Sequence, residues 1–241
     1  MKATQFEFKY RALLIALTYC VGYWLYAVDR VNSLAWLAQW MLGPHGAHQR
    51  LAVKLMAAFA ALLVGFGALV RTWGAAYLQS SVVHDAKLHS SELVADGPYR
   101  HVRHPLYFAS IVANFGFALL ASRPGFFVIV IVLTLLYIRL AGREEVELDR
   151  EQGEGYREFS RRVPKLWPSI RARVPATGAK PRWGQAFLGE AFMWGFTAAF
   201  GLFAITLNTT VLWSAVGVAL LIFIEQQIVH NRRQRKQAAA A

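Results

Sequence analysis

The sequence has few cysteines and few charged residues, and each shortage excludes a class of protein. Cys20 is the single cysteine among 241 residues, so neither a disulfide framework nor a cysteine-ligated metal site is available. Because Cys20 lies inside an apolar run, we expect it to be a core residue. Only 17% of the residues are charged, whereas 56% are hydrophobic. This balance argues against a soluble domain and is typical of a chain that meets lipid.

Acidic residues are also scarce, with 14 Asp and Glu against 26 Lys and Arg, which gives a net charge of +12. Such a charge can indicate a nucleic-acid partner. The basic residues here lie between apolar runs, however, and form no stripe with interleaved aromatics. We therefore expect them to face anionic membrane lipids, and we expect neither nucleic acid nor a metal as a partner.

Apolar residues gather in separate segments, most of which approach the ~20 residues that a helix needs to cross a bilayer. The segments are Tyr10 to Val28, Leu51 to Val70, Pro105 to Ala121, Phe126 to Leu140, Ala186 to Leu207 and Thr210 to Ile224. The third and fourth are short and are joined by Ser122 to Gly125, which predicts a helical hairpin. The sequence thus predicts an all-α, polytopic membrane bundle of about six transmembrane helices.

The distribution of Lys and Arg orients this bundle. With six crossings, 22 of the 26 basic residues lie on one side of the membrane. The positive-inside rule then places both termini and both long polar loops in the cytoplasm. Leu34 to Leu42 is too short to cross and carries two tryptophans one turn apart, so we expect an interfacial helix on the outer face. We divide the chain into N-terminal spans (1–70), a core (71–168), and a linker with two further spans (169–241).

Basic residues cluster where the third apolar segment begins. Asp96 to Tyr99 has the composition of a turn, and Pro105 suits the first turn of a helix. The cluster therefore lies at a helix N-terminus, where free N–H groups favour an anion. It consists of Arg100, His101, Arg103 and His104. The alternative is that these residues only anchor the chain to lipid phosphates.

An acidic pair, Glu144 and Glu145, follows the fourth segment. Acidic residues contribute little to topology, so their position at a membrane boundary needs another cause. One cause is ordinary ion pairing along a solvated helix, with Arg143, Arg150 and Arg157 as partners of Glu145 and Asp149. The other is a cationic ligand. Because the hairpin brings the basic and acidic clusters to one face, a single pocket there can hold both charges of a zwitterion.

The ordered motifs resemble a known family. The run Gly97-Pro98-Tyr99-Arg100-His101-Val102-Arg103-His104-Pro105-Leu106-Tyr107 is followed by Glu144-Glu145, Leu148, Gly155-Tyr156 and Val163-Pro164. This combination resembles the isoprenylcysteine carboxyl methyltransferases and their relatives among the phospholipid methyltransferases. The resemblance covers about residues 71 to 168. It implies a helical membrane enzyme that uses S-adenosylmethionine at the cytoplasmic end of the hairpin.

The resemblance also implies a set of site residues. Cofactor-binding positions fall on His84, Ser91, Glu92, Leu93, Val94, Tyr99, His104, Pro105, Leu106, Tyr107, Glu144 and Glu145. A basic residue near the end of the fourth span, Arg139 or Arg143, would orient the acceptor, because arginine can bind a carboxylate in two contacts. Two departures stand out: Phe108-Ala109-Ser110 replaces a glycine common in relatives, and two further spans follow Val163-Pro164.

The acceptor is not defined by these residues. A prenylcysteine-type carboxylate or a small thiol is weakly favoured over a phospholipid amine, which would need a nearby base such as His101. A non-enzymatic scaffold that retains the fold is the alternative from another class. A transporter is disfavoured, since ionisable residues are sparse in the spans and no broken helix is indicated. Glu190 and Glu225 are expected at solvated span ends.

Overall fold

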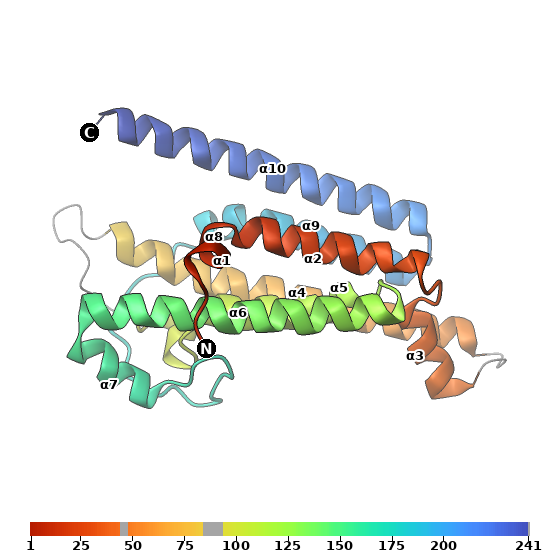
Figure 1. Cartoon of the computed structure of the whole chain (residues 1–241), viewed down its shortest axis with the longest axis horizontal. Helices are drawn as coiled ribbons and strands as arrows, with labels where there is room; N and C mark the ends of the chain where they lie inside the picture. Colours follow the sequence, from red (N-terminus) through yellow and green to blue (C-terminus); the bar gives the residue numbers. More distant parts are fainter. Residues whose placement is uncertain (44–47, 84–93, 241) are drawn as a thin grey trace.

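The chain folds into a bundle of α-helices whose longest members run side by side (Figure 1). The structure is a computed structural model and describes residues 1–43, 48–83 and 94–240. The helices are α1 (Gln5–Lys9), α2 (Arg11–Trp24), η1 (Leu25–Ala27), α3 (Ser33–Leu42), α4 (Gln49–Val83), η2 (Gly97–Arg100), α5 (Pro105–Ala118), α6 (Arg123–Gln152), α7 (Glu154–Arg162), α8 (Trp183–Gly189), α9 (Ala191–Thr206) and α10 (Thr209–Ala240). The all-α prediction is confirmed.

Three of these helices are long and apolar enough to cross a membrane, namely α4, α6 and α10. The pair α8 and α9 makes a fourth candidate if its 63° bend lies within one span. The apolar helices α2 with η1, and α5, are shorter. The described residues therefore contain several helices that are long and apolar enough to span a membrane, whereas six crossings and the sidedness of the termini stay predictions.

Small residues allow α4 and α5 to approach each other closely. A Cβ atom added at Gly67 would lie 2.8 Å from the Cβ of Ala113. One added at Gly116 would lie 2.7 Å from the carbonyl oxygen of Ala60. Backbones this close gain van der Waals contact, which drives helix association where no hydrophobic effect operates. This helix pair supports the candidate site, because the site lies at the N-terminus of α5.

The predicted hairpin of α5 and α6 is present, but α6 is longer than the segment 126–140. At its start Ser122 is the N-cap and accepts a 3.4 Å hydrogen bond from the Gly125 amide. The helix then continues without a break to Gln152 and ends at Gly153, whose φ of +56° suits glycine. The acidic cluster therefore belongs to the same helix as the apolar span, because residues such as Glu, Arg and Leu continue a helix as readily as apolar ones.

The expectation that Cys20 is a core residue is wrong. Cys20 is exposed on α2 and is not a core residue. The buried face of α2 carries Thr18 and Gly22, four positions apart, so Cys20 points to the opposite side of the helix. An apolar run in a membrane has a lipid-facing side as well as a core side, and hydropathy alone does not distinguish them.

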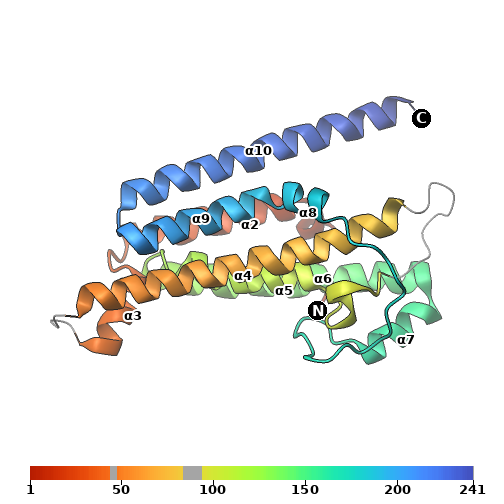
Figure 2. The same cartoon turned by 180° about the vertical axis from the view of Figure 1, so that it is seen from behind.

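The C-terminal helices contain the second correction. A bend of 63° separates α8 from α9 at Glu190, although no broken helix was expected there. Glu190 is buried at 6% exposure and does not lie at a solvated span end, whereas Glu225 is exposed as predicted. α9 packs on α4, and α10 lies against α9 at the outer edge of the bundle (Figure 2).

Candidate active site

The site is built at the N-terminus of α5. The turn η2 begins at Gly97, whose φ of +56° and contact with the Tyr77 ring leave no room for a side chain. His104 then precedes the first residue of α5, and its carbonyl oxygen accepts a 3.0 Å hydrogen bond from Phe108 N. Pro105 follows in the first turn, where its missing N–H costs nothing. The side chain of His104 is thereby held at a helix start, with only 7% exposed.

His104 lies between the two carboxylates of α6. Its Nδ1 is 3.5 Å from Glu144 Oε2, and its Nε2 is 3.5 Å from Glu145 Oε1. Burial alone would lower the pKa of His104, but hydrogen bonding and attraction to Glu144 and Glu145 outweigh it and raise the pKa above 6.5. The prediction that the hairpin joins the basic motif to the acidic pair is confirmed by these distances.

The two acidic residues have different surroundings. Glu145 pairs with Arg103 at 3.1 Å and with Lys165 at 2.7 Å, and its side chain is 18% exposed. Glu144 accepts a 2.5 Å hydrogen bond from the Tyr107 hydroxyl and stays 36% exposed. Glu145 is thus neutralised by cations of the protein itself, whereas Glu144 has no Lys or Arg partner among the described residues and still reaches the surface of the site.

Tyr99 lies on the α4 side of this cluster. Its ring is 8% exposed, and burial raises the pKa of its phenol, an effect that the charge of Glu144 increases and that of Arg71 opposes. Leu106 contacts α4 where a Cβ added at Gly74 would lie 3.1 Å from Leu106 Cδ2. Val94 is half-buried. The remaining expected positions, His84, Ser91, Glu92 and Leu93, lie outside the described residues.

Residues 163–182, which we call the strap, were expected in part to be a simple linker. Instead the strap is hydrogen-bonded to residues 97–104, which we call the motif loop. Arg103 N donates to Pro164 O at 2.9 Å, and His104 N donates to Lys165 O at 3.2 Å. Farther on, Ser169 N donates to His101 O at 2.9 Å. The strap therefore fixes the backbone of the loop that carries His104.

Asp96 is the main anchor of the strap. It is 3% exposed and accepts hydrogen bonds from the Thr177 amide (2.9 Å), the Thr177 hydroxyl and the Ala179 amide (2.9 Å). Burial alone would raise the pKa of Asp96, but these hydrogen bonds lower it below its ordinary value of 3.8. Sequence reasoning placed Asp96 only in a turn, because its partners lie 81 and 83 positions away.

Arg139 and Arg143, the expected acceptor-orienting residues, lie against the N-terminal segment. Arg139 makes two hydrogen bonds to Glu7, at 2.9 and 2.8 Å. Arg143 pairs with Glu147 at 3.2 Å and stacks over the Phe8 ring at 5.3 Å. Part of the ordinary ion pairing that was considered is also present, since Arg157 binds Asp149 at 2.7 Å. A role for Arg139 or Arg143 toward an acceptor stays a prediction.

His101, the residue considered as a base, lies beside the strap. Its Nδ1 is 2.8 Å from the Ser169 carbonyl oxygen, so that nitrogen carries the proton when the ring is neutral. The ring also lies 6.1 Å from that of Trp73. The backbone of the strap therefore determines which ring nitrogen of His101 is free to accept a proton.

Comparison with known proteins matches one segment of the chain to a family. Residues 55–153 match the family model described as phospholipid methyltransferase, and this segment contains His104, Tyr107 and Glu144. No curated protein and no solved structure matches the chain. The matched segment ends before the strap and before α8 to α10. Over residues 55–153 the chain is similar to the phospholipid methyltransferase family, whose members are S-adenosylmethionine-dependent methyltransferases of class EC 2.1.1.

Proposed function

We propose that the chain methylates the head group of a membrane lipid in a pocket formed by the motif loop, α5 and the end of α6. A phospholipid amine is the first acceptor to test, because the matched family is named for phospholipid methylation. A prenylcysteine-type carboxylate or a thiol is the second. A lipid acceptor accounts for an enzyme with several apolar helices, since such a substrate arrives from the bilayer.

The residues present suit a cationic cofactor. Glu144 supplies a partly exposed carboxylate, which can meet the ammonium or the sulfonium of S-adenosylmethionine. The buried Nε2 of His104 lies 3.5 Å from Glu145 Oε1 but makes no hydrogen bond within the described residues, so it can donate one to a further polar atom. When bound, the cofactor supplies an electrophilic methyl group. The protein's task is then orientation and the exclusion of water.

The polar residues divide this task between them. Tyr107 fixes the rotamer of Glu144 through its 2.5 Å hydrogen bond, and protonated His104 lies on the other oxygen of the same carboxylate. An amine acceptor must lose a proton before or during attack, and the free ring nitrogen of His101 is the base we assign to it. A carboxylate or thiolate acceptor needs no such base.

We also propose that this pocket faces the cytoplasm and that the chain crosses the membrane six times. The excess of basic residues in the motif loop and strap supports the sidedness. Delivery of a polar cofactor supports it as well, because S-adenosylmethionine is a soluble cytoplasmic compound. The short apolar helices α2 with η1, and α5, account for the two crossings beyond the four long candidates.

The observation that carries the proposal is the exposed carboxylate of Glu144 between His104 and Tyr107. Titration calorimetry of the full-length protein in detergent tests it with Glu144→Gln and His104→Ala. We expect each to bind S-adenosylmethionine at least about 10-fold more weakly, or about 1.4 kcal/mol. Glu147→Gln is the control, since Glu147 is an exposed acid on the same helix that pairs with Arg143. Unchanged affinity in both site variants would show that the site is wrongly assigned.

The same titration distinguishes which cationic group Glu144 meets. S-adenosylhomocysteine keeps the ammonium and the ribose but lacks the sulfonium charge. If Glu144 meets the sulfonium, Glu144→Gln weakens binding of S-adenosylmethionine more than binding of S-adenosylhomocysteine. Equal losses for the two compounds place the carboxylate at the ammonium or the ribose.

A further inference from the structure

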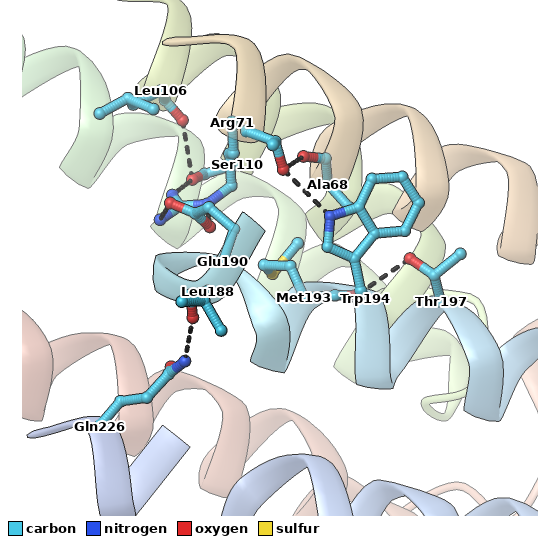
Figure 3. Close-up of polar contacts among 11 residues, drawn as sticks. Ala68, Arg71, Leu106, Ser110, Leu188, Glu190, Met193, Trp194, Thr197 and Gln226 are labelled. Atoms are coloured by element: carbon cyan, nitrogen blue, oxygen red, sulfur yellow. Dashed lines mark hydrogen bonds and ion pairs between the residues drawn. The ribbon is translucent and has the colours of Figure 1, made fainter. Parts of the chain in front are cut away.

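A second charged cluster joins α4, α5 and the bend between α8 and α9 (Figure 3). Arg71 of α4 binds Glu190 through two hydrogen bonds, Nε to Oε2 at 2.7 Å and Nη2 to Oε1 at 3.0 Å. Its Nη1 donates to Ser110 Oγ of α5 at 2.9 Å. The cluster thus joins the family segment to the bend between α8 and α9, which lies beyond that segment.

A contribution to the stability of the fold does not by itself explain why this charged cluster is present. The side chains of Arg71 and Glu190 are only 22% and 8% exposed. The desolvation of a buried ion pair costs about as much as the pair returns, and well-packed apolar residues commonly serve as well. Nearby, Trp194 Nε1 donates to Thr72 Oγ1 at 3.0 Å, so α9 already has a polar attachment to α4. Ionisable residues within membrane helices most often mark a functional site.

The position of Arg71 connects it with the methyl-transfer site. The hydroxyl of Ser110, which accepts from Arg71, donates a hydrogen bond to the carbonyl oxygen of Leu106. Leu106 lies in the first turn of α5. Gly74, one turn along α4 from Arg71, packs against Leu106 and Pro105. The charges of Arg71 and Glu144 both act on the buried phenol of Tyr99. The pKa of Tyr99 is therefore influenced both by a negative group, Glu144, and by a positive group, Arg71.

Arg71 also has hydrogen-bonding capacity left. A guanidinium carries five N–H groups. Three of them donate hydrogen bonds here: the one on Nε, one of the two on Nη1 and one of the two on Nη2. The other N–H on each terminal nitrogen has no partner among the described residues. Unused guanidinium N–H groups can donate hydrogen bonds to a carboxylate or a phosphate, which are the anions that arginine suits best.

We propose that Arg71 binds the anionic group of the lipid acceptor and that Glu190 is the positioning residue that holds its guanidinium toward the site. This rests on the proposed methyltransferase function. The anionic group is the phosphodiester of a phospholipid or the carboxylate of a prenylcysteine, and both meet an arginine in the same way. The bend at Glu190 then has a role: it turns the start of α9 so that a carboxylate from outside the family segment reaches Arg71.

The two residues should have different effects on kinetics. Arg71→Gln removes the contact with the acceptor, so we expect the KM for the acceptor to rise at least about 10-fold. Glu190→Gln leaves the cation in place but frees its orientation, so kcat should fall while the acceptor KM stays unchanged or decreases. A purely structural ion pair predicts the opposite: both variants would behave alike, and the swap Arg71→Glu with Glu190→Arg would restore activity.

Binding can be tested without turnover. Equilibrium dialysis of the full-length protein in detergent uses two radiolabelled probes, dihexanoyl-phosphatidylethanolamine and N-acetyl-S-farnesylcysteine. We expect Arg71→Gln to retain one of them at least about 10-fold less well than the parent protein, and the affected probe identifies the acceptor. Arg123→Gln is the control, because Arg123 is an ion-paired arginine at the other end of the hairpin, 2.7 Å from Asp29.

The outcomes separate this inference from the function it rests on. Calorimetry of S-adenosylmethionine binding should give the same affinity for Arg71→Gln and for the parent protein, while Glu144→Gln loses affinity. Equal retention of both probes by Arg71→Gln and the parent, including no retention by either, overturns the role of Arg71. So does a loss of retention in Arg139→Gln or Arg143→Gln that Arg71→Gln lacks. Failure of S-adenosylmethionine to bind the parent protein contradicts the proposed function instead.

Discussion

The Tyr107 hydroxyl donates a 2.5 Å hydrogen bond to Glu144, although 37 positions separate the two residues. The bond crosses the hairpin from the first turn of α5 to the final third of α6. The bond restricts the rotamer of Glu144 and leaves its side chain 36% exposed. A carboxylate that binds a charged ligand needs both a fixed orientation and access to the ligand.

Loss of this bond should weaken cofactor binding. Tyr107→Phe keeps the ring and removes the donor, so Glu144 loses a hydrogen bond to a charged group, worth about 1.5 kcal/mol or more. We expect S-adenosylmethionine affinity to fall roughly 10-fold in calorimetry. Tyr23→Phe is the matched control, because its hydroxyl donates to Phe117 O at 2.9 Å near the other end of α5. Equal losses in the two variants would count against a local role for Tyr107.

The contribution of His104 should depend on pH. Its folded pKa is raised above 6.5, so its stabilisation is fully present below pH 6.5 and is lost as the pH rises through the folded value. We expect the Tm difference between the parent protein and His104→Gln to be largest near pH 6 and to shrink toward pH 9. A difference that grows with pH would mean that neutral His104 is the stabilising form.

The strap should be released when Asp96 is removed. Asp96→Ala leaves the amides of Thr177 and Ala179 without an acceptor, at a cost of about 2 kcal/mol or more. We expect a lower Tm and faster tryptic cleavage after Arg173, an exposed strap residue that precedes Val174. Glu158→Ala is a control, since its pair with Arg162 is exposed. Unchanged cleavage after Arg173 would show that other contacts hold the strap.

Acid should have a related effect on the strap of the parent protein. Because the folded pKa of Asp96 is lowered, its stabilisation is present above about pH 4 and is lost as the pH falls through the folded value. Acid pepsin digestion of the parent protein and Asp96→Ala should therefore differ at pH 4 and converge toward pH 2. A difference that persists at pH 2 would assign the effect to packing.

The close contact of α4 and α5 predicts a steric effect. Gly116→Val places side-chain atoms against the Ala60 carbonyl and Val64, which would lie 2.7 and 2.8 Å from the new Cβ. We expect destabilisation of about 1–3 kcal/mol, measured by thermal unfolding in detergent. Gly201→Ala in α9 is the control, because a Cβ there meets nothing within 4 Å. It should be neutral or slightly stabilising.

Sidedness can be tested with single cysteines in a Cys20→Ala background. Asn208, between α9 and α10, and Ala172 in the strap are both exposed. With six crossings and cytoplasmic termini, an impermeant maleimide should label Asn208→Cys in intact cells and Ala172→Cys only after permeabilisation. The reverse pattern would invert the orientation, and labelling of both positions in intact cells would contradict an active site in the cytoplasm.

The sequence was sufficient to predict the part of the site that depends on residues close together in the chain. Turn residues, a proline at a helix start and an apolar hairpin placed His104 opposite Glu144, because each step involves neighbours along the chain. The same reasoning did not divide the roles of the acidic pair. Lys165 and Arg103 neutralise Glu145 and leave Glu144 available, and that difference depends on how the strap folds back.

Other features depended on contacts that no local pattern contains. Glu190 appears in the sequence as a polar residue at the edge of an apolar run, and its partner Arg71 appears as one more cytoplasmic cation. Their pairing is visible only when α9 lies against α4. The exposed position of Cys20 likewise depends on which side of α2 meets the bundle.

The pairing of Arg71 with Glu190 also has a consequence for how the protein is made. Arg71 is synthesised 119 positions before its partner, so α4 enters the membrane with an arginine that has no counter-charge. An unpaired arginine costs roughly 2.5–3.5 kcal/mol at the centre of an inserted helix and less toward its end. The family segment therefore lacks the counter-charge of Arg71 until Glu190 has been synthesised.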